Sequence, residues 1–284
     1  MLKVGSLFSG AGLCDLGLAW AGFEHQWFCE IDPFCRAVLA RHWPDTLIYN
    51  DVSGLKGTYL PPVDVLCGGF PCQDVSSAGG RAGIKQGTRS GLWYEYARLI
   101  GEVRPRYVII ENVRGLLSRG IEIVLQDLAA LGYDAEWEVL PAAAFGAPHH
   151  RERVFIVAYP HGRLSDGGHR LLSPLQGNLG NVNQSPQLFD WLGLRIDRAR
   201  KASALEAYPG PVLYRVDDGR TERLDGTGRP QPGQAHKIGR VDTATARAWV
   251  PRLKALGNGI TPRQSYAVAV CILQAEGLPV PPRP

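Results

Sequence analysis

The sequence has no apolar stretch long enough to cross a membrane, no internal repeat and no low-complexity tract. A membrane helix needs about 20 apolar residues, so we expect no membrane span. The chain reaches Ser9 and Gly10 before any long apolar run, which predicts no signal peptide and a cytoplasmic location. Six cysteines are present, but none form a Cys-x-x-Cys pair. Neither a zinc site nor disulfides are therefore expected.

Composition places the chain among ordinary globular proteins, with 45% hydrophobic and 20% charged residues. These values exclude a disordered chain, a coiled coil and a collagen-like rod. The net charge of +4 is unevenly spread, because residues 160–254 hold fifteen Lys and Arg against nine Asp and Glu. A basic segment on a slightly acidic body is typical of a polyanion-binding module joined to an enzyme core. A soluble surface with an arginine bias is the plainer alternative.

Strand-like and helix-like segments alternate through residues 1–159, which predicts an α/β fold with a Rossmann-like, doubly wound, mostly parallel sheet. Such sheets bind ligands at the carboxyl ends of their strands. Residues 160–250 are rich in Gly, Pro, Asn and Arg and predict a separate, smaller, loop-rich domain. We expect strands at residues 3–8, 24–30, 46–49, 63–67, 106–110, 133–140 and 154–158, and helices at 13–21, 33–42, 122–131 and 263–274.

The first unusual motif is Phe8-Ser9-Gly10-Ala11-Gly12, directly after the first expected strand. Glycines there permit a tight turn and bring the backbone close to a ligand at a helix N-terminus. Glu30 ends the second strand, where a carboxylate can bind ribose hydroxyls, and Asp51 follows the third, within reach of an adenine amino group. A tight turn of purely structural value is the alternative, but the two acids favour a nucleoside ligand.

A second motif, Pro71-Cys72-Gln73, follows the fourth expected strand. Cys67 lies inside that strand and fits an inert core position. Cys72 instead lies in a turn, where a thiolate can be exposed as a nucleophile requires. The glycine-rich loop at residues 74–91 is a candidate lid, with a flexible connection as the alternative.

Glu111-Asn112 ends the fifth strand, where a carboxylate is costly unless it is paired or takes part in chemistry. Helix capping is the structural alternative. His149-His150-Arg151-Glu152-Arg153 leads into the last strand, and its two arginines share one strand face. Solvated arginines are again the alternative. The adjacent histidines point to opposite faces, so they indicate a metal only weakly.

In this order, the motifs FSGAG, PCQ, ENV, HRER and GNGITP (residues 257–262) resemble those of the DNA (cytosine-5) methyltransferase family of bacterial and phage type. His149 stands where the family usually has glutamine, and the motif that normally precedes the last one is not found intact. The resemblance implies a catalytic, S-adenosylmethionine-binding domain of the class I methyltransferase type, formed by residues 1–159 and 251–284. It also implies a target-recognition domain at residues 160–250.

The resemblance implies methyl transfer from S-adenosylmethionine to C5 of a cytosine in a specific double-stranded DNA sequence, with Cys72 adding to C6 of a flipped-out base. Glu111 would hold N3 and the exocyclic amine, and Arg153, with Arg151 beside it, would face O2. For the cofactor pocket to close, the last helix must pack back beside the first strand. The implied cofactor residues are Phe8, Ser9, Gly10, Gly12, Leu13, Glu30, Ile31, Asp51, Val52, Pro71, Asn258 and Thr261. The candidate DNA contacts are Gln73, Ser76, Arg195, Arg198, Arg200, Lys201, Arg215 and Arg220.

The same resemblance implies S-adenosylhomocysteine as product, no metal, a monomeric enzyme in a prokaryotic cytoplasm, and double-stranded DNA as partner. A cognate restriction endonuclease is a candidate second partner. Three alternatives stay open: a tRNA methyltransferase of the same family, a catalytically silent DNA-binding relative, and a Rossmann oxidoreductase. The basic segment is longer than we expect for the tRNA enzyme, and Cys72 with Glu111 argues against a silent relative. Asp15, at the position of the third glycine of GxGxxG, argues against the oxidoreductase.

Overall fold

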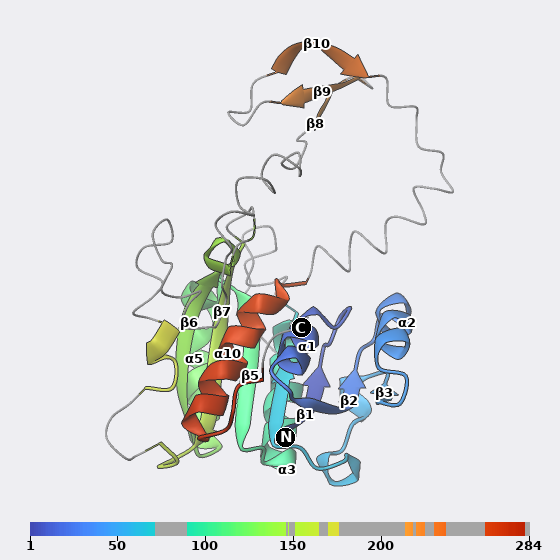
Figure 1. Ribbon diagram of the computed structural model, residues 1–284. Coiled ribbons are helices and arrows are strands. Elements are labelled where there is room, and N and C mark those ends of the chain that lie inside the picture. Colours follow the sequence, from blue (N-terminus) through green and yellow to red (C-terminus); the bar gives the residue numbers. More distant parts are fainter. Residues whose placement is uncertain are drawn as a thin grey trace. The chain divides into compact units, whose positions relative to one another are not determined.

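In the computed structural model, the apolar runs of the first 160 residues form the strands of one seven-stranded sheet (Figure 1). The structure describes residues 1–71, 90–145, 147, 151–164, 170–175, 214–217, 220–224, 230–236 and 259–281. The chain divides into two units, residues 1–193 with 255–284 and residues 194–254. The seven strands are β1 (Lys3–Leu7), β2 (Glu24–Cys29), β3 (Leu47–Tyr49), β4 (Val65–Gly68), β5 (Tyr107–Val113), β6 (Tyr133–Pro141) and β7 (Glu152–Pro160).

The strand order is β3-β2-β1-β4-β5-β7-β6, and the pairings among the first five of these strands are all parallel. β7 alone runs against its neighbours, pairing antiparallel with both β5 and β6. The order reverses between β1 and β4, where strands that lead away in opposite directions leave a crevice at their carboxyl ends. The predicted mostly parallel, doubly wound sheet is therefore confirmed.

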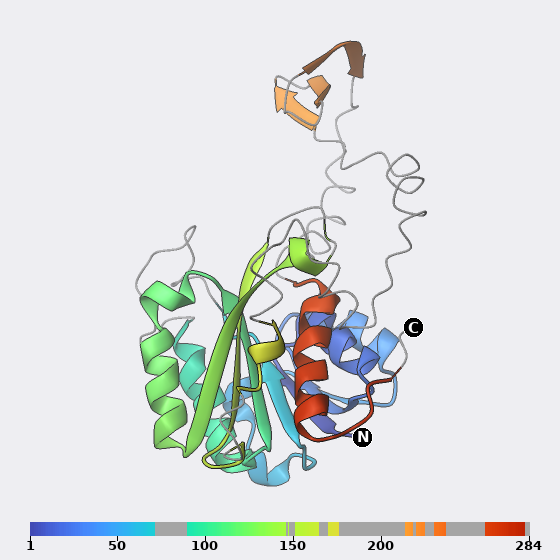
Figure 2. The ribbon, with the colours of Figure 1, turned by 60° about the vertical axis from the view of Figure 1, so that its left-hand side comes forward.

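Helices cover both faces of the sheet (Figure 2). The core of one face contains Trp27, Leu66, Val108 and Ile110 together with buried residues of three helices. Successive residues of a strand point to opposite faces of the sheet. The residues that alternate with these core residues therefore face the helices on the other side. One face carries α3 (Trp93–Val103), α4 (Leu116–Arg119) and α5 (Ile121–Ala130), and the other carries α1 (Leu13–Trp20), α2 (Pro33–His42) and α10 (Pro262–Ala275).

Two helices begin where the sequence supplies strong start signals. Asp32 caps α2 by accepting from the backbone N–H of Phe34 at 2.9 Å, and Pro33 occupies the first helical position. Thr261 and Gln264 form a capping box at the start of α10. These signals explain why the predicted bounds of α2 match the structure and those of α10 differ from it by only one residue at each end.

The C-terminal helix returns to the first helix rather than lying beside the first strand. Ser265 on α10 donates from Oγ to the backbone oxygen of Cys14 at 2.8 Å. A Cβ atom at Gly17 would lie 2.1 Å from the Pro262 carbonyl oxygen, so the two helices are in backbone contact. α10 therefore places residues 259–261 at the carboxyl edge of the sheet, next to the first turn of α1.

Two predicted strand bounds are wrong for a common reason. β5 was expected to end at residue 110, with Glu111 beyond it, but it continues to Val113. β7 was expected to begin at residue 154 but begins at Glu152. The antiparallel pairing of the two strands adds these residues, because Glu111 is in register with Phe155. Glu111 still projects past the end of β4, whose last residue, Gly68, pairs with Ile110.

The second unit contains a three-stranded antiparallel sheet in the order β10-β9-β8. The sequence predicted a loop-rich domain in this region and did not predict these three strands. The strands of this sheet are β8 (Tyr214–Asp217), β9 (Arg220–Leu224) and β10 (Pro230–His236).

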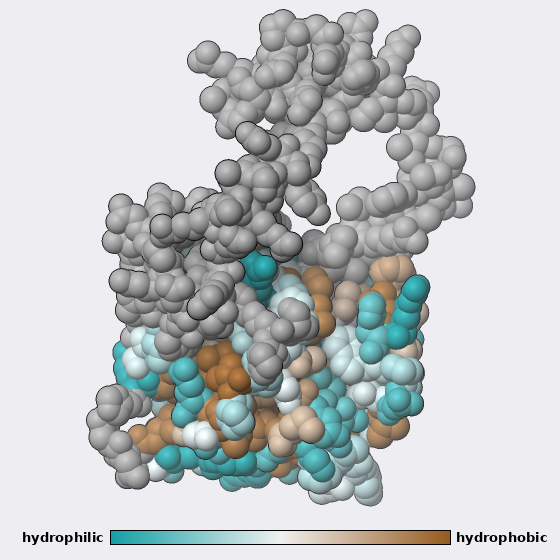
Figure 3. Space-filling view, viewed as in Figure 1, coloured by the Kyte–Doolittle hydropathy of each residue, from teal (hydrophilic) through white to brown (hydrophobic). Residues whose placement is uncertain are grey.

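Within the described residues, no helix combines the length and apolarity needed to traverse a bilayer. On the face seen in Figure 3, polar side chains surround smaller apolar areas.

Candidate active site at the carboxyl edge of the sheet

The turn after β1 is held in an unusual backbone conformation. Phe8, Gly10 and Gly12 all have positive φ angles, of 54°, 54° and 77°. A non-glycine residue such as Phe8 adopts this region rarely and at a cost, a feature that clusters at functional sites. Gly12 packs so closely that a Cβ atom would lie 2.8 Å from the ring of Trp43, whereas at Gly10 no atom of the described residues, its own chain neighbours aside, lies within 4 Å of such a position. The turn therefore presents bare backbone to open space.

Glu30 ties this turn to the end of β2. Its side chain accepts from the Gly10 N–H at 2.7 Å with Oε2 and from the Asp32 N–H at 2.8 Å with Oε1. The residue is buried, with 8% of its surface exposed. Each carboxylate oxygen has a second lone pair, so Glu30 can accept from ligand hydroxyls while it fixes the turn. Its part in shaping the glycine turn was not predicted.

Beside Glu30, the edge offers an exposed apolar side chain and a further carboxylate. Ile31 is 71% exposed, which is unusual for a large apolar residue, whereas Val52 is buried. Asp51 accepts from the backbone N–H and the hydroxyl of Ser53, at 3.0 and 2.8 Å, and so caps the short helix Val52–Gly54. These two hydrogen bonds hold the pKa of Asp51 below its usual range. The group therefore places an exposed apolar side chain near a charged acceptor at the carboxyl edge.

A second half of the site forms around Glu111. Arg153 on β7 lies with Nε 2.9 Å from Glu111 Oε1, and the two side chains are only 13% and 16% exposed. Gly69 makes room for this pair, because a Cβ atom there would lie 2.6 Å from Glu111 Oε2. The Gly68-Gly69 doublet after a buried strand was the available signal for this close approach, which the sequence reasoning missed.

Burial raises the pKa of Glu111 to about 7, and the positive charges of Arg153 and Arg151 oppose that rise only in part. The carboxyl group can therefore gain or lose a proton near neutral pH. Perturbed acids of this kind are enriched at functional sites. Burial also raises the pKa of the Cys14 thiol, with the charges of Asp15 and Glu111 adding to the effect, so Glu111 lies close to the first turn of α1.

Asn112 fixes the backbone that leads from β4 toward the predicted nucleophile. Its Nδ2 donates to the carbonyl oxygen of Phe70 at 3.1 Å, and its Oδ1 accepts from the Val113 N–H at 2.9 Å. The residue is buried, so both groups of the amide are used inside the protein. Cys72 itself, with Gln73 and Ser76, lies outside the described residues.

Arg151, the other predicted arginine, holds the segment of residues 259–261 at the site. Arg151 has a φ of 29° and donates from Nε to the carbonyl oxygen of Gly259 at 2.9 Å. Gln264 donates to the backbone oxygens of Leu140 and Arg151, at 2.5 and 3.5 Å. Thr261 is thus brought to the carboxyl edge through its neighbours, as its predicted place near the cofactor requires.

The remaining predicted residues divide into three groups. Ser9 is engaged locally, with Oγ 2.9 Å from Ser6 Oγ, while Leu13 begins α1 and Pro71 is half-buried. Arg215 and Arg220 lie on β8 and β9. Asn258 and the four basic residues Arg195, Arg198, Arg200 and Lys201 fall outside the described residues. In the part of the chain that is described, no group of three or more His, Cys, Asp and Glu side chains could hold a metal ion.

A Rossmann-like sheet with a strained glycine turn, a carboxylate at the end of β2 and a buried acid–arginine pair defines a nucleoside-binding enzyme fold. The family model of C-5 cytosine-specific DNA methylase matches residues 2–190, and the chain belongs to this family. The predicted family is therefore confirmed. Membership also sets aside the Rossmann oxidoreductase alternative.

Among curated relatives, the chain is 39% identical over 165 residues to the Type II methyltransferase M2.BsuMI of Bacillus subtilis, covering 55% of this chain and 42% of that protein. It is 28% identical over 292 residues to the orphan methyltransferase M.Rho11sI of Bacillus phage rho11s, covering 98% and 56%. The chain spans about half the length of the curated relatives it matches.

Among solved structures, a putative DNA modification methyltransferase encoded within an E. coli prophage is similar, at 30% identity and a TM-score of 0.48. That similarity covers 56% of this chain and 47% of the other.

The raised pKa of Glu111 predicts a pH-dependent loss of stability. Its pKa rises from the ordinary 4.5 to about 7 in the folded state, so the folded protein binds more protons than the unfolded chain between these values. Stability from this group is complete below pH 4.5 and is lost as the pH rises toward 7. Urea unfolding should show that the free energy of unfolding falls by up to about 3 kcal/mol more between pH 5 and 8 for the wild type than for Glu111→Gln.

The exposed Glu122 on α5 provides a matched control, since Glu122→Gln should retain the wild-type pH dependence. Parallel stability curves for Glu111→Gln and the wild type would show that the Glu111 carboxyl group does not titrate in this range.

Proposed function

We propose that this protein transfers a methyl group from S-adenosylmethionine to C5 of a cytosine in double-stranded DNA. The observation on which this proposal depends is the largely buried Glu111–Arg153 pair at the carboxyl edge of the sheet. The pair packs over Gly69, from which the chain continues to Cys72. Family membership supports cytosine as the methylated base. The basic segment supports a polyanionic substrate, and we propose double-stranded DNA rather than tRNA.

The cofactor fits the first half of the site. The acceptor oxygens of Glu30 and the exposed Ile31 suit the ribose of an adenosyl group, and the bare backbone at Gly10 leaves room for the methionine end of the cofactor. Asp51 and Val52 lie next along the edge and suit the adenine ring, while Phe8 and Gly12 shape the end of the pocket nearer α1. When bound, S-adenosylmethionine supplies an electrophilic methyl group.

Cytosine C5 is a weak nucleophile, so the protein must activate it. In the proposed mechanism the Cys72 thiolate forms a bond to C6, and the electrons of the C5–C6 double bond move toward C5. Protonated Glu111 donates to N3 and so stabilises the negative charge that the addition creates. Arg153 holds the Glu111 carboxyl group in place and faces the O2 side of the ring. C5 would take the methyl group of S-adenosylmethionine, which leaves as S-adenosylhomocysteine. A base would then remove the C5 proton, so that the C5–C6 double bond re-forms and the C6–S bond breaks to release the Cys72 thiolate.

A cytosine cannot react in this way inside a duplex, so the base must be flipped out of the stack, at a cost of a few kcal/mol. We propose that residues 160–250 form the target-recognition domain and help to offset this cost, while residues 1–159 and 251–284 form the catalytic domain. Arg215 and Arg220 lie on an antiparallel pair of strands, and a two-stranded ribbon can enter the major groove. A restriction endonuclease of the same system remains a candidate partner.

Cys72 should be the nucleophile, and its replacement separates chemistry from cofactor binding. Cys72→Ala should abolish methylation of duplex DNA by labelled S-adenosylmethionine, while calorimetric titration with S-adenosylhomocysteine stays close to wild type. A duplex with 5-fluorocytosine at the target should trap Cys72 covalently, because fluorine cannot leave as a proton does. Cys271→Ala is the control. Turnover by Cys72→Ala would refute the proposal, as would an adduct at another cysteine, and methylation of tRNA but not DNA would reassign the substrate.

Glu30 and Asp51 should determine cofactor affinity. Glu30→Ala removes a buried acceptor worth about 1–3 kcal/mol, so the affinity for S-adenosylhomocysteine should fall about ten- to a hundredfold. Asp51→Asn keeps an oxygen that can cap Ser53 but loses the charged acceptor, and it should weaken binding to a smaller extent. Glu24, at the exposed opposite end of β2, gives the matched control Glu24→Ala. Wild-type affinity in both site variants would place the nucleoside elsewhere.

Sequence preference should move with residues 160–250. Arginine on guanine is the commonest specific contact in the major groove, and this segment holds thirteen lysines and arginines. Grafting it onto a family member of different specificity should transfer this protein's methylation context, as read by bisulfite sequencing. The ungrafted relative is the control. An active chimera that keeps the relative's context would show that recognition lies outside these residues.

A further inference from the structure

The segment after β3 that carries Asp51 and Val52 is attached to helix α3 by an arginine with no assigned role. Arg98 donates from Nη2 to the carbonyl oxygen of Val52 at 3.2 Å. Val52 is 46 residues away along the chain and lies where we place the adenine ring.

Two carboxylates of α3 hold the Arg98 guanidinium in position. Glu95 Oε2 accepts from Arg98 Nε at 3.0 Å and from Nη2 at 2.7 Å, and Glu102 Oε1 accepts from Nη1 at 2.7 Å. All three side chains are one-third exposed. An isolated surface ion pair contributes little to stability. Hydrogen bonds from the planar Arg98 guanidinium to the two carboxylates instead limit the motion of the Arg98 side chain.

Glu102 makes a second contact with the same segment. Its Oε2 accepts from the Gly57 N–H at 2.6 Å, while its Oε1 holds Arg98. The Gly57 N–H and the Arg98 guanidinium together hold the pKa of Glu102 below its usual range, so it stays charged at neutral pH. Arg98 and Glu102 therefore bracket residues 52–57 at both ends.

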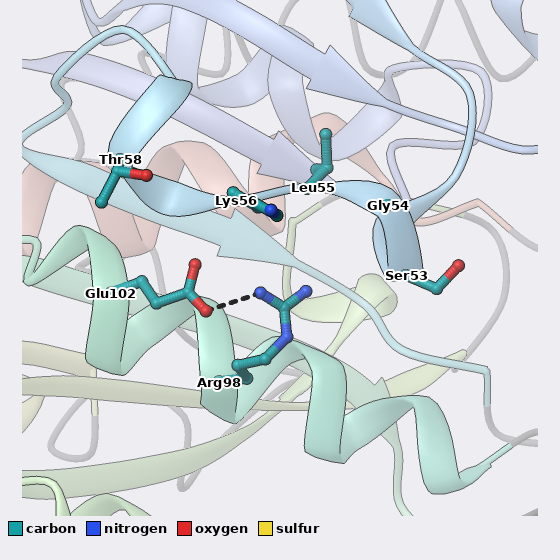
Figure 4. Close-up of a pocket in the computed structure, with 7 residues that line it drawn as sticks. All are labelled: Ser53, Gly54, Leu55, Lys56, Thr58, Arg98 and Glu102. Atoms are coloured by element: carbon teal, nitrogen blue, oxygen red, sulfur yellow. Dashed lines mark hydrogen bonds and ion pairs between the residues drawn. The ribbon is translucent and has the colours of Figure 1, made fainter.

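Figure 4 shows Arg98 and Glu102 reaching from α3 toward this segment across a surface pocket. Ser53, Lys56 and Thr58 line the opposite side of the pocket. The segment also packs against the helix, because a Cβ atom at Gly57 would lie 2.6 Å from Glu102 Cβ, and Val52 and Leu55 belong to the same hydrophobic core as the buried residues of α3. Loss of the polar contacts should therefore loosen the backbone of residues 52–57 while this packing keeps the segment on the core.

We propose that Arg98 is a positioning residue for the cofactor: with Glu102 it fixes the backbone of residues 52–57, so that Asp51 and Val52 are presented to the adenine ring. The inference rests on the proposed cofactor site. It assigns to α3 a part in nucleoside recognition, through the Val52 carbonyl and without contact to the cofactor.

Arg98→Ala should lower the affinity for S-adenosylhomocysteine about five- to tenfold by calorimetry, the effect of one lost hydrogen bond. The KM for S-adenosylmethionine should rise by a similar factor, with kcat unchanged at saturating cofactor. Discrimination against S-inosylhomocysteine, which carries an oxo group in place of the adenine amino group, should also fall. Arg98→Lys should recover part of the affinity, because its ammonium group can reach one carbonyl but cannot form the fork.

Arg104 supplies the matched control, since it ends the same helix but donates to the Leu131 carbonyl oxygen, away from residues 52–57. Arg104→Ala should bind and discriminate as the wild type does. Glu102→Ala tests the other arm of the bracket and should resemble Arg98→Ala. It also serves as the second variant should Arg98→Ala fail to fold, which thermal unfolding without ligand would reveal.

Wild-type affinity and discrimination in both Arg98→Ala and Glu102→Ala would overturn the inference. The Glu30→Ala and Asp51→Asn variants separate this outcome from failure of the proposed site. If those two variants lose affinity while the bracket variants do not, only the role of Arg98 is wrong. If all four bind as the wild type, the cofactor lies elsewhere and the inference falls with the site.

Discussion

The contact between Glu111 and Arg153 depends on the direction of a single strand. Glu111 lies near the carboxyl end of β5, so only an antiparallel neighbour can place its own first residues beside it. β7 is that neighbour, and its register sets Arg153 opposite Val113 and next to Glu111. A parallel β7 would carry Arg153 to the far edge of the sheet. The one reversed strand thus allows a buried acid to be paired, because an unpaired charge there would be costly.

The parts of the fold with local causes could be predicted from the sequence. Strand and helix alternation gave the parallel sheet, and the proline after Asp32 marked the start of α2. The glycine turn at residues 8–12 was located from the motif alone. α3 was not predicted, although its buried residues Trp93, Tyr96, Leu99 and Ile100 repeat at helical spacing. That signal was present in the sequence.

The contacts that shape the site were not predictable in the same way, because they join residues far apart in the chain. Glu30 was expected to face a ligand, and the structure adds its hydrogen bond to Gly10, twenty residues earlier. The extension of β5 past Ile110 depends on β7, which lies more than forty residues later. The sequence motifs therefore located the edge of the sheet and its acids. Cys72 and the basic residues of 195–201 remain predictions.

The return of α10 onto α1 closes the unit formed by residues 1–193 and 255–284 into a loop of chain, held by hydrogen bonds from Ser265 to Cys14 and from Arg151 to Gly259. Closing such a loop costs conformational entropy, but the cost rises only with the logarithm of length, by about 0.6 kcal/mol for each doubling. Fixed contacts on both sides therefore constrain the length of the chain between residues 176 and 258 only weakly. Insertions or deletions in this stretch should change the stability of the sheet very little, so its length can vary without altering the residues at the carboxyl edge.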